Sequence, residues 1–407
     1  MRCAFVSVLL RSLWLIALFF PVFSPAFVWG DDFKLVPSLS VKEDYNSNIL
    51  LSATDVRKDF ITTFSPGVEM VDRTGRLDTD LTLHLDQIEY ADNQGLSGTN
   101  QQYSGTLNYL VSPLLSVSGG AGYSRNTNPT LQGIGSTGFI TEAVPWNHIT
   151  YSLSTNYQFT EETAGTLSYS NGRDYFDNPN FLSDTTRNGA AGLVHDFGEY
   201  FPTVKGRMNV VYSYYAYPNS RINSGMGTIG FSKNINEIWS VQVDGGVSNT
   251  WSRVLVPVQI IGVPVTLLVP INKEGLGWVG DASLNYKGEV GSGSFTFSRS
   301  LSPAYGLNGA AEQNALTLAT QYQFSYEFSA LFSAGYNSLK SLASEFSAQA
   351  ISEQILRVNP GVRYEFSKDM ALESSYEYDM VDYSTSKDKA NRHIFSVRFY
   401  MQHPFFQ

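Results

Sequence analysis

The sequence is poor in cysteine and in charge. Its 407 residues include a single cysteine, Cys3, and only 16% of them are Asp, Glu, Lys or Arg, whereas soluble globular domains carry about 25% charged residues. One cysteine close to the amino terminus leaves the rest of the chain without a disulfide or a thiolate metal site. Beyond the amino-terminal segment there is also no run of about 18 apolar residues, which excludes a polytopic helical membrane protein.

Aromatic residues and glycine are abundant instead. The chain contains 24 Tyr, 26 Phe, 6 Trp and 34 Gly, so that 14% of its residues are aromatic. Disordered chains are poor in aromatic and β-branched residues, and this composition therefore excludes intrinsic disorder. It favours a β protein in which apolar and polar residues alternate.

The first thirty residues predict an export signal. Arg2 and Arg11 form a basic region, and the apolar run 13–20 follows. This order is typical of a secretory signal peptide, which we expect to be cleaved after Ala26 or after Gly30. The alternative is a single transmembrane anchor, which the prolines that interrupt the segment disfavour. The predicted organisation is a signal peptide at 1–30 and one domain at 31–407.

Removal of this segment makes the chain more acidic. The 27 basic residues include Arg2 and Arg11, so cleavage leaves 25 basic against 37 acidic residues and changes the net charge from −10 to −12. Nucleic-acid-binding domains carry basic patches. The charge balance therefore excludes nucleic acid as a partner.

A two-residue alternation of apolar and polar side chains runs through the remaining chain. Residues 77–87 are an example, because leucines on one side alternate with Asp78, Asp80, His84 and Asp86 on the other. A period of two places the two sets on opposite faces of a β-strand. The same alternation predicts eighteen strands, at 33–45, 59–73, 77–91, 99–111, 114–127, 146–159, 162–175, 186–197, 204–217, 221–233, 236–252, 276–288, 290–301, 312–325, 328–340, 351–366, 369–384 and 389–401.

The connections between these strands alternate in length. Short turns such as 74–76 and 367–368 alternate with longer polar connections such as 46–58 and 128–145. Outer-membrane barrels have short periplasmic turns and long extracellular loops. The sequence therefore predicts an all-β fold, a transmembrane antiparallel up-and-down β-barrel of about eighteen strands, in the cell outer membrane. A soluble sandwich or propeller is the alternative, but its turns would not alternate in length.

In such a barrel the polar face of each strand lines the lumen. Ser, Thr, Asn, Gln and Gly dominate this face, which suits neutral hydrophilic solutes such as sugars. A few charged side chains share it, and they are our candidate pore-lining residues: Asp78, Asp80, His84, Asp86, Arg357, Arg363, Glu373, Glu377, Asp379, Arg392 and Arg398.

The charged residues of the last three strands have complementary signs. By alternation and turn position, we expect Arg363 to lie near Glu373, Arg357 near Glu377 or Asp379, and Arg398 opposite Glu373 to Glu377. One interpretation is a structural ion ladder that keeps the wall rigid. The other is a selectivity strip along the pore.

The connection 253–275 is anomalous because it is apolar. Pro257, Pro264 and Pro270 exclude a helix there, since an interior proline costs about 3 kcal/mol, and its two halves resemble a hairpin. So much apolar surface should not face water. The segment could extend the barrel wall outward, fold inward as a constriction or plug, or dock a partner or lipopolysaccharide.

An enzyme is the less favoured class. His84 and Asp86 share one face of a strand and could form a base and its orienting carboxylate. However, the chain lacks a Gly-x-Ser-x-Gly elbow, paired metal-binding histidines and a phosphate-binding glycine loop. We therefore predict no catalytic residues, no metal site and no cofactor.

The start of the predicted barrel resembles a known family. Residues 33–49, FKLVPSLSVKEDYNSNI, are similar to the opening strand of the β-barrel porin 2 family, in which an Asp/Glu-x-Asn-x-Asn-Ile element follows the first strand. Residues 64–68, FSPGV, are similar to its second strand, and the pattern extends over 33–401. Members of this family are often associated with exopolysaccharide systems. The resemblance thus implies an outer-membrane exit route for a polysaccharide.

These observations predict an outer-membrane porin-like channel that serves exopolysaccharide or capsular polysaccharide export. A general diffusion porin for small hydrophilic solutes is the first alternative, and a non-conducting scaffold or adhesin that displays loops 128–145 and 253–275 is the second. The expected partners are outer-membrane lipid, lipopolysaccharide and the barrel-assembly machinery, together with polysaccharide and periplasmic export proteins if export is the function.

Overall fold

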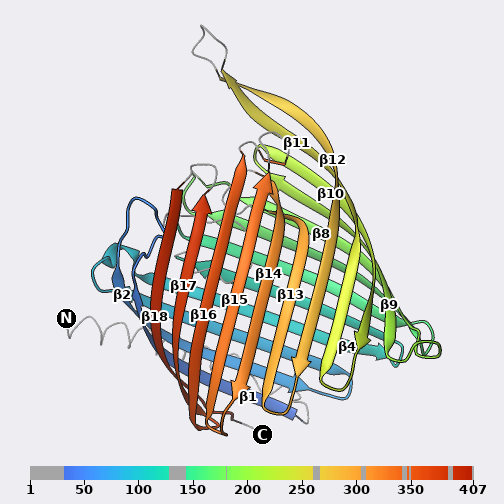
Figure 1. Cartoon of the computed structure of the whole chain (residues 1–407), viewed down its shortest axis with the longest axis horizontal. Helices are drawn as coiled ribbons and strands as arrows, with labels where there is room; N and C mark the ends of the chain where they lie inside the picture. The colour runs from blue at the N-terminus through green and yellow to red at the C-terminus, as the bar shows by residue number, and fades with distance from the viewer. Residues whose placement is uncertain are drawn as a thin grey trace, which may run out of the picture.

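A computed structural model describes residues 32–127, 144–179, 181–259, 266–303, 309–341, 346–347, 350–383 and 388–405. The predicted export signal and its cleavage sites lie outside these residues. The described chain forms eighteen strands (Figure 1): β1 Asp32–Asn46, β2 Asp59–Arg73, β3 Leu77–Tyr90, β4 Gly98–Ser112, β5 Leu115–Asn126, β6 Trp146–Gln158, β7 Thr163–Phe176, β8 Asp184–Asp196, β9 Val204–Tyr217, β10 Ser220–Asn234, β11 Trp239–Gln259, β12 Thr266–Lys287, β13 Gly291–Pro303, β14 Ala310–Gln323, β15 Phe328–Ser341, β16 Ile351–Ser367, β17 Met370–Tyr383 and β18 Asp388–Gln402.

The strands form one closed antiparallel sheet. Each strand pairs with its sequence neighbours, and β1 closes the sheet by pairing with both β2 and β18. Closure removes the free edges that an open sheet of this size would expose. The predicted fold class, an all-β up-and-down barrel of eighteen strands, is confirmed. A single short 3-10 turn, Gln94–Leu96, interrupts the described strands, and no helix in the described ranges is long and apolar enough to cross a membrane.

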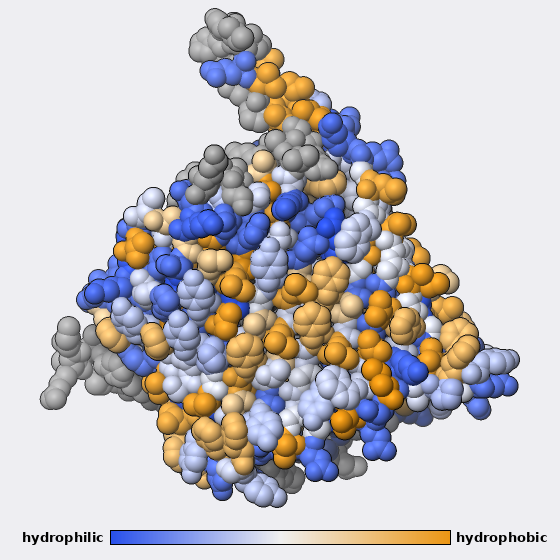
Figure 2. All heavy atoms as spheres, viewed as in Figure 1, coloured by the Kyte–Doolittle hydropathy of each residue, from blue (hydrophilic) through white to orange (hydrophobic). Residues whose placement is uncertain are grey.

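The outer face of the barrel is apolar. On β3, Leu81, Leu83 and Leu85 leave 40%, 45% and 37% of their surface exposed, because they point away from the barrel axis. Figure 2 shows many such apolar residues over the middle of one side of the barrel, while hydrophilic residues gather towards the rim that bears the long connections. An apolar band of this kind is the surface that a membrane-spanning barrel presents to lipid.

Aromatic rings cluster beside the short turns, as predicted. Phe159 packs edge-on against Tyr157, with ring centroids 5.0 Å apart, and also lies over Gly165 of the next strand, where an added Cβ would be 2.5 Å from the ring. Phe197 covers Gly206 in the same way. Each glycine therefore admits a ring that shields the backbone near a turn.

The described parts of the segment 253–275, residues 253–259 and 266–275, are strands, so their assignment to a long connection was wrong. They belong to β11 and β12, which pair in register from Trp239–Tyr286 to Gln259–Thr266, so the expected hairpin pairing of the two halves is confirmed. The described part of this hairpin stands above the barrel rim in Figure 1. Pairing of β12 with β13 stops at Gly280 and Arg299. Of the three predicted roles, the described part of the hairpin fits the outward extension of the wall and does not fit an inward plug.

Candidate functional site: the inner wall and the β1–β2 loop

The acidic strip predicted on β3 lies on the inner face. Asp78, Asp80, His84 and Asp86 alternate with the exposed leucines of the outer face. His84 and Asp86 form the predicted pair, with Nε2 and Oδ1 2.9 Å apart. Ser65 Oγ donates a 2.5 Å hydrogen bond to the same Oδ1 atom. In a catalytic triad the histidine contacts the serine nucleophile. Here His84 and Ser65 both contact the carboxylate of Asp86, so the three residues do not have the geometry of a triad.

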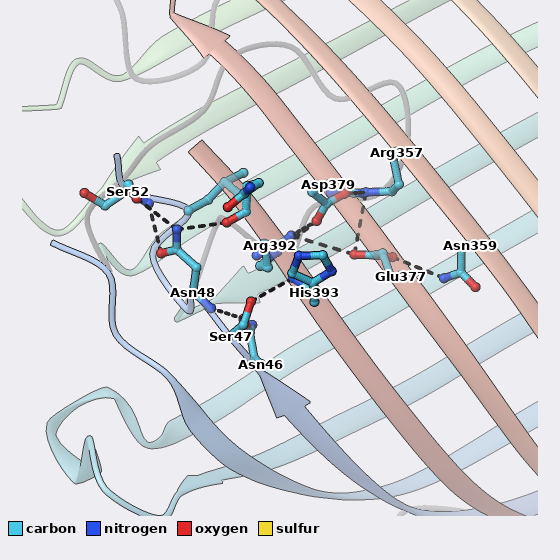
Figure 3. A network of polar contacts seen from close by, with 12 residues as sticks. Asn46, Ser47, Asn48, Ser52, Arg357, Asn359, Glu377, Asp379, Arg392 and His393 are labelled. Atoms are coloured by element: carbon cyan, nitrogen blue, oxygen red, sulfur yellow. Dashed lines mark hydrogen bonds and ion pairs between the residues drawn. The ribbon is translucent and has the colours of Figure 1, made fainter. Parts of the chain in front are cut away.

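Strands β16, β17 and β18 bring together four of the predicted charged residues. Their register places Arg357 opposite Asp379, and Asp379 opposite Arg392. Asp379 accepts a hydrogen bond of 2.5 Å from Nε of Arg357 and one of 2.8 Å from Nε of Arg392. Glu377 lies 3.6 Å from Arg357 Nε and 3.7 Å from Arg392 Nη2. Two guanidinium groups and two carboxylates thus form one cluster without net charge (Figure 3).

This cluster is excluded from solvent. The side chains of Arg357, Asp379 and Arg392 are 6%, 0% and 1% exposed, and Glu377 is 21% exposed. A passing solute cannot reach charges that are covered to this extent. The geometry therefore favours the structural ion ladder over the selectivity strip for this part of the wall.

The other charged residues of the same three strands are more accessible. The register places Arg363 opposite Glu373 and Glu373 opposite Arg398, as predicted. The ion pair of Arg363, however, is with Glu365 on its own strand, at 3.1 Å. Arg398 is exposed and has no ion pair within the described part of the chain. These residues, nearer the short turns, are the charged groups of the last strands that the lumen can reach.

The β1–β2 loop, residues 47–58, packs against the inner wall. Ile49 is fully buried in a cluster with Ile61, Ile88 and Tyr90, which point inward from β2 and β3. Leu51, also fully buried, belongs to a second cluster with inner-face residues of β14 to β18. Two side chains of the loop thus fill apolar positions of the inner wall, and the loop occupies part of the lumen.

Polar contacts fix this loop to β18. The backbone N–H of Ser47 donates to the carbonyl of His393 at 3.0 Å, and Asn48 Nδ2 donates to the carbonyl of Asn391 at 3.1 Å (Figure 3). The amide of Asn48 also accepts from the backbone N–H of Ser52 at 3.1 Å. Leu51 adopts a φ of 49°, a left-handed conformation that a side chain accepts only where its surroundings hold it.

The loop and the ion cluster form two successive layers. Ile355, Val381 and Ala390 oppose one another one row beyond the ion cluster, on the side of the long connections. All three belong to the apolar cluster that contains Leu51. The loop therefore helps to seal an apolar layer over the buried charges. Removing the β1–β2 loop would expose the apolar side chains of Ile355, Val381 and Ala390, which lie next to the buried charges.

The inward position of this loop was missed by the sequence analysis, which treated 46–58 as a polar extracellular connection. The available signal was the run Ile49–Leu51, three apolar residues inside an otherwise polar segment. Such a run needs a covered position. Which wall covers it depends on strand pairing over the whole chain, and the pattern of one segment cannot supply that information.

No group of three or more His, Cys, Asp or Glu side chains within the described ranges is placed to hold a metal ion. At the ends of β6 and β7, Asp174 accepts a 2.7 Å hydrogen bond from Trp146 Nε1 and lies 2.6 Å from His148 Nδ1. This contact orients the histidine on the inner face. The three residues in contact, Trp146, His148 and Asp174, include no serine or cysteine that could act as a nucleophile.

The chain matches no family model and no curated protein, so the porin-family resemblance of its first strands remains a prediction. Among solved structures, it is similar to Acinetobacter baumannii OccAB1, with 9% identity and a TM-score of 0.48 over 93% of this chain and 98% of that chain. It is also similar to the outer membrane protein opdK from Pseudomonas aeruginosa, with 9% identity and a TM-score of 0.45 over 92% and 100%.

Proposed function

We propose that this protein is an outer-membrane porin-like channel through which small hydrophilic solutes diffuse. The observation that carries the proposal is the closed eighteen-stranded barrel with an apolar outer face and a hydroxyl-, amide- and charge-bearing inner face. Barrels of sixteen to eighteen strands enclose an aqueous channel unless a segment fills it. Mixed charges and small polar groups favour neutral hydrophilic solutes over a single class of ion.

The β1–β2 loop sets the size limit in this proposal. Because Ile49 and Leu51 pack in apolar clusters of the inner wall, the loop is held inside the lumen and does not extend into the surrounding solvent. A constriction of this kind favours small solutes over a polymer. Polysaccharide export, implied by the resemblance of the first strand, has no contact in the described wall that supports it in preference to diffusion.

The experiment is conductance of the purified barrel in a planar bilayer. The backbone N–H of Ile49 donates to the carbonyl of Arg57 at 2.8 Å, so residues 50–56 can be replaced by a two-residue Asn-Gly turn without moving the ends. We expect the native chain to conduct and the shortened loop to raise single-channel conductance. A matched control shortens the β11–β12 hairpin above Val254, which extends beyond the barrel rim and should leave conductance unchanged.

Sugar uptake into liposomes separates the two channel functions. Native barrels should admit monosaccharides and exclude long oligosaccharides, while the loop-shortened barrel should admit larger sugars. A folded native barrel without any conductance would refute the channel. Free passage of long oligosaccharides through the native barrel would instead favour polysaccharide export.

A further inference from the structure

Arginines that point outward gather on one side of the barrel, at the ends of β7 to β11 nearest the long connections. Arg173, Arg187, Arg221 and Arg253 lie on the outer face of β7, β8, β10 and β11, the same face that carries the exposed residues Leu167, Leu193, Ile229 and Trp251 of these strands. All four are exposed. We call these four residues the arginine belt.

Three of the four arginines lie in one cross-strand row of the sheet. Arg173 opposes Thr185, Thr185 opposes Ala216, Ala216 opposes Arg221, and Arg221 opposes Arg253. Four strand spacings of about 4.8 Å separate the first and last of these arginines, or about 19 Å along the ladder. Arg187 lies two residues further along β8, with its guanidinium 5.9 Å from the ring centre of Tyr214.

These positive charges are not neutralised by the wall around them. Arg173, Arg221 and Arg253 form no ion pair with any residue in the described ranges, and Arg221 and Arg253 face each other directly across two strands. Like charges in directly opposed positions destabilise a sheet. The outward carboxylate near them, Glu274, accepts hydrogen bonds from Trp251 Nε1 at 3.0 Å and Asn249 Nδ2 at 2.9 Å. A bound anion would relieve the repulsion.

The surface below the belt identifies the kind of anion. Along the same strands, towards the short turns, come the exposed aromatics Tyr212 and Trp251, and then the exposed aliphatics Val210 and Val247. From the short turns towards the belt, the outer face therefore carries aliphatic, then aromatic, then basic residues. The parts of a lipid meet a membrane protein in the same order: acyl chains, interface and headgroup. An anion held by the belt would therefore be attached to a lipid that covers the aliphatic rows.

We propose that the arginine belt binds the phosphate groups of a phosphorylated lipid in the outer leaflet of the membrane. Guanidinium groups bind phosphate through paired, charge-assisted hydrogen bonds, and their spacing over five strands allows more than one phosphate of a large headgroup to be engaged. The proposal rests on the membrane location in the proposed function but not on conduction, so lipid binding and conductance can fail independently.

The test measures binding of fluorescent lipopolysaccharide to the purified barrel in a neutral detergent. In the belt variant, Arg173, Arg187, Arg221 and Arg253 are replaced by Gln. The control variant removes the same number of positive charges by the short turns, with Gln at Arg73, Arg76, Lys233 and Lys368, which are all exposed. We expect affinity to fall by about tenfold or more in the belt variant and to change little in the control.

Two further probes identify the ligand. Lipid A without its phosphates should bind the native barrel as weakly as phosphorylated lipid binds the belt variant. Inorganic phosphate at millimolar concentration should not displace the lipid, and if it does so, the belt is a general anion site and the lipid assignment is wrong. Equal losses in the belt and control variants would also overturn the proposal, because they would reflect net charge alone.

Folding of each variant is checked by its heat-dependent electrophoretic mobility. If the fourfold belt variant does not fold, the double variant Arg221→Gln/Arg253→Gln replaces it, since it removes the opposed pair and its repulsion. Unchanged lipid affinity in that folded double variant contradicts the proposal.

Discussion

Asp379 joins two arginines from neighbouring strands through its two carboxylate oxygens. Oδ1 accepts from Nε of Arg357, and Oδ2 accepts from Nε of Arg392. The side chains of Asp379 and Arg392 are 0% and 1% exposed, so neither charge can be solvated if its partner is lost. The last three strands of the barrel are therefore locked together at one point of the inner wall.

Replacement of Asp379 by Asn is expected to destabilise the barrel by about 3–5 kcal/mol, because it leaves two arginines buried without their shared carboxylate. Urea unfolding in lipid vesicles, followed by tryptophan fluorescence, measures the effect. Asp382→Asn is the matched control on the same strand. Its partner Lys389 has a side chain that is 70% exposed, and such pairs contribute about 0–1 kcal/mol. Equal losses in the two variants would contradict the buried cluster.

Leu51→Ala is expected to loosen the β1–β2 loop from the wall. Truncation of a fully buried leucine costs about 2–5 kcal/mol, and a loss of about 2 kcal/mol raises the population of the opened loop about thirtyfold. Trypsin cleavage after Arg57 or Lys58 reports this opening. Val56→Ala, at a position that is 61% exposed in the same loop, should leave the cleavage rate nearly unchanged. A rate equal to that of the native chain in Leu51→Ala would show that the loop is not held by packing.

Cysteine labelling checks which face of β3 lines the lumen. In a chain with Cys3 replaced by Ser, Asp80→Cys should react with a membrane-impermeant thiol reagent, and Leu81→Cys should not, because adjacent residues point to opposite faces of the strand. The barrel is labelled in lipid vesicles and the modified fraction is measured by mass spectrometry. Similar reaction at both positions would contradict the assigned inner face.

Arg398→Glu is expected to shift the channel towards cations. Arg398 is exposed on the inner face beside Glu373, and reversal of its charge adds negative potential where solutes pass. Reversal potentials under a salt gradient should show the cation-to-anion permeability ratio rising about twofold or more. Lys368→Glu makes the same charge change in an exposed turn outside the wall and should have a smaller effect. No shift in Arg398→Glu would place this residue away from the conducting path.

Much of the inner wall could be predicted from the sequence. The alternation of Leu81, Leu83 and Leu85 with Asp80 and Asp86 assigned two faces, and strand order around short turns placed Arg363 opposite Glu373. The position of Arg363 opposite Glu373 is confirmed, but its guanidinium contacts Glu365 of its own strand at 3.1 Å, a contact that the alternation did not predict. Register determines which backbones are opposed, but the rotamers of long side chains decide which charges touch.

Burial was not predictable in the same way. The two-residue alternation places all the charged residues of the last strands on the inner face alike, although Asp379 is buried and Arg398 is exposed. Asp379 is enclosed by Arg357 and Arg392, and the row above it is covered by Leu51, which is remote from Asp379 in the chain. Likewise, the apolar segment 253–275 could be assigned to a hairpin from its composition, but its outward direction is set by where β12 leaves β13.

The sequence by itself determined the repeating unit of this protein: strands with one apolar and one polar face, joined by connections of alternating length. These properties are local, because a period of two and the length of a turn depend only on neighbouring residues. Only the tertiary structure decided what meets across the closed wall, namely β1 against β18 and the loop residues Ile49 and Leu51 against the inner face. Closure of eighteen strands brings together residues that are remote in sequence, and no local pattern encodes their pairing.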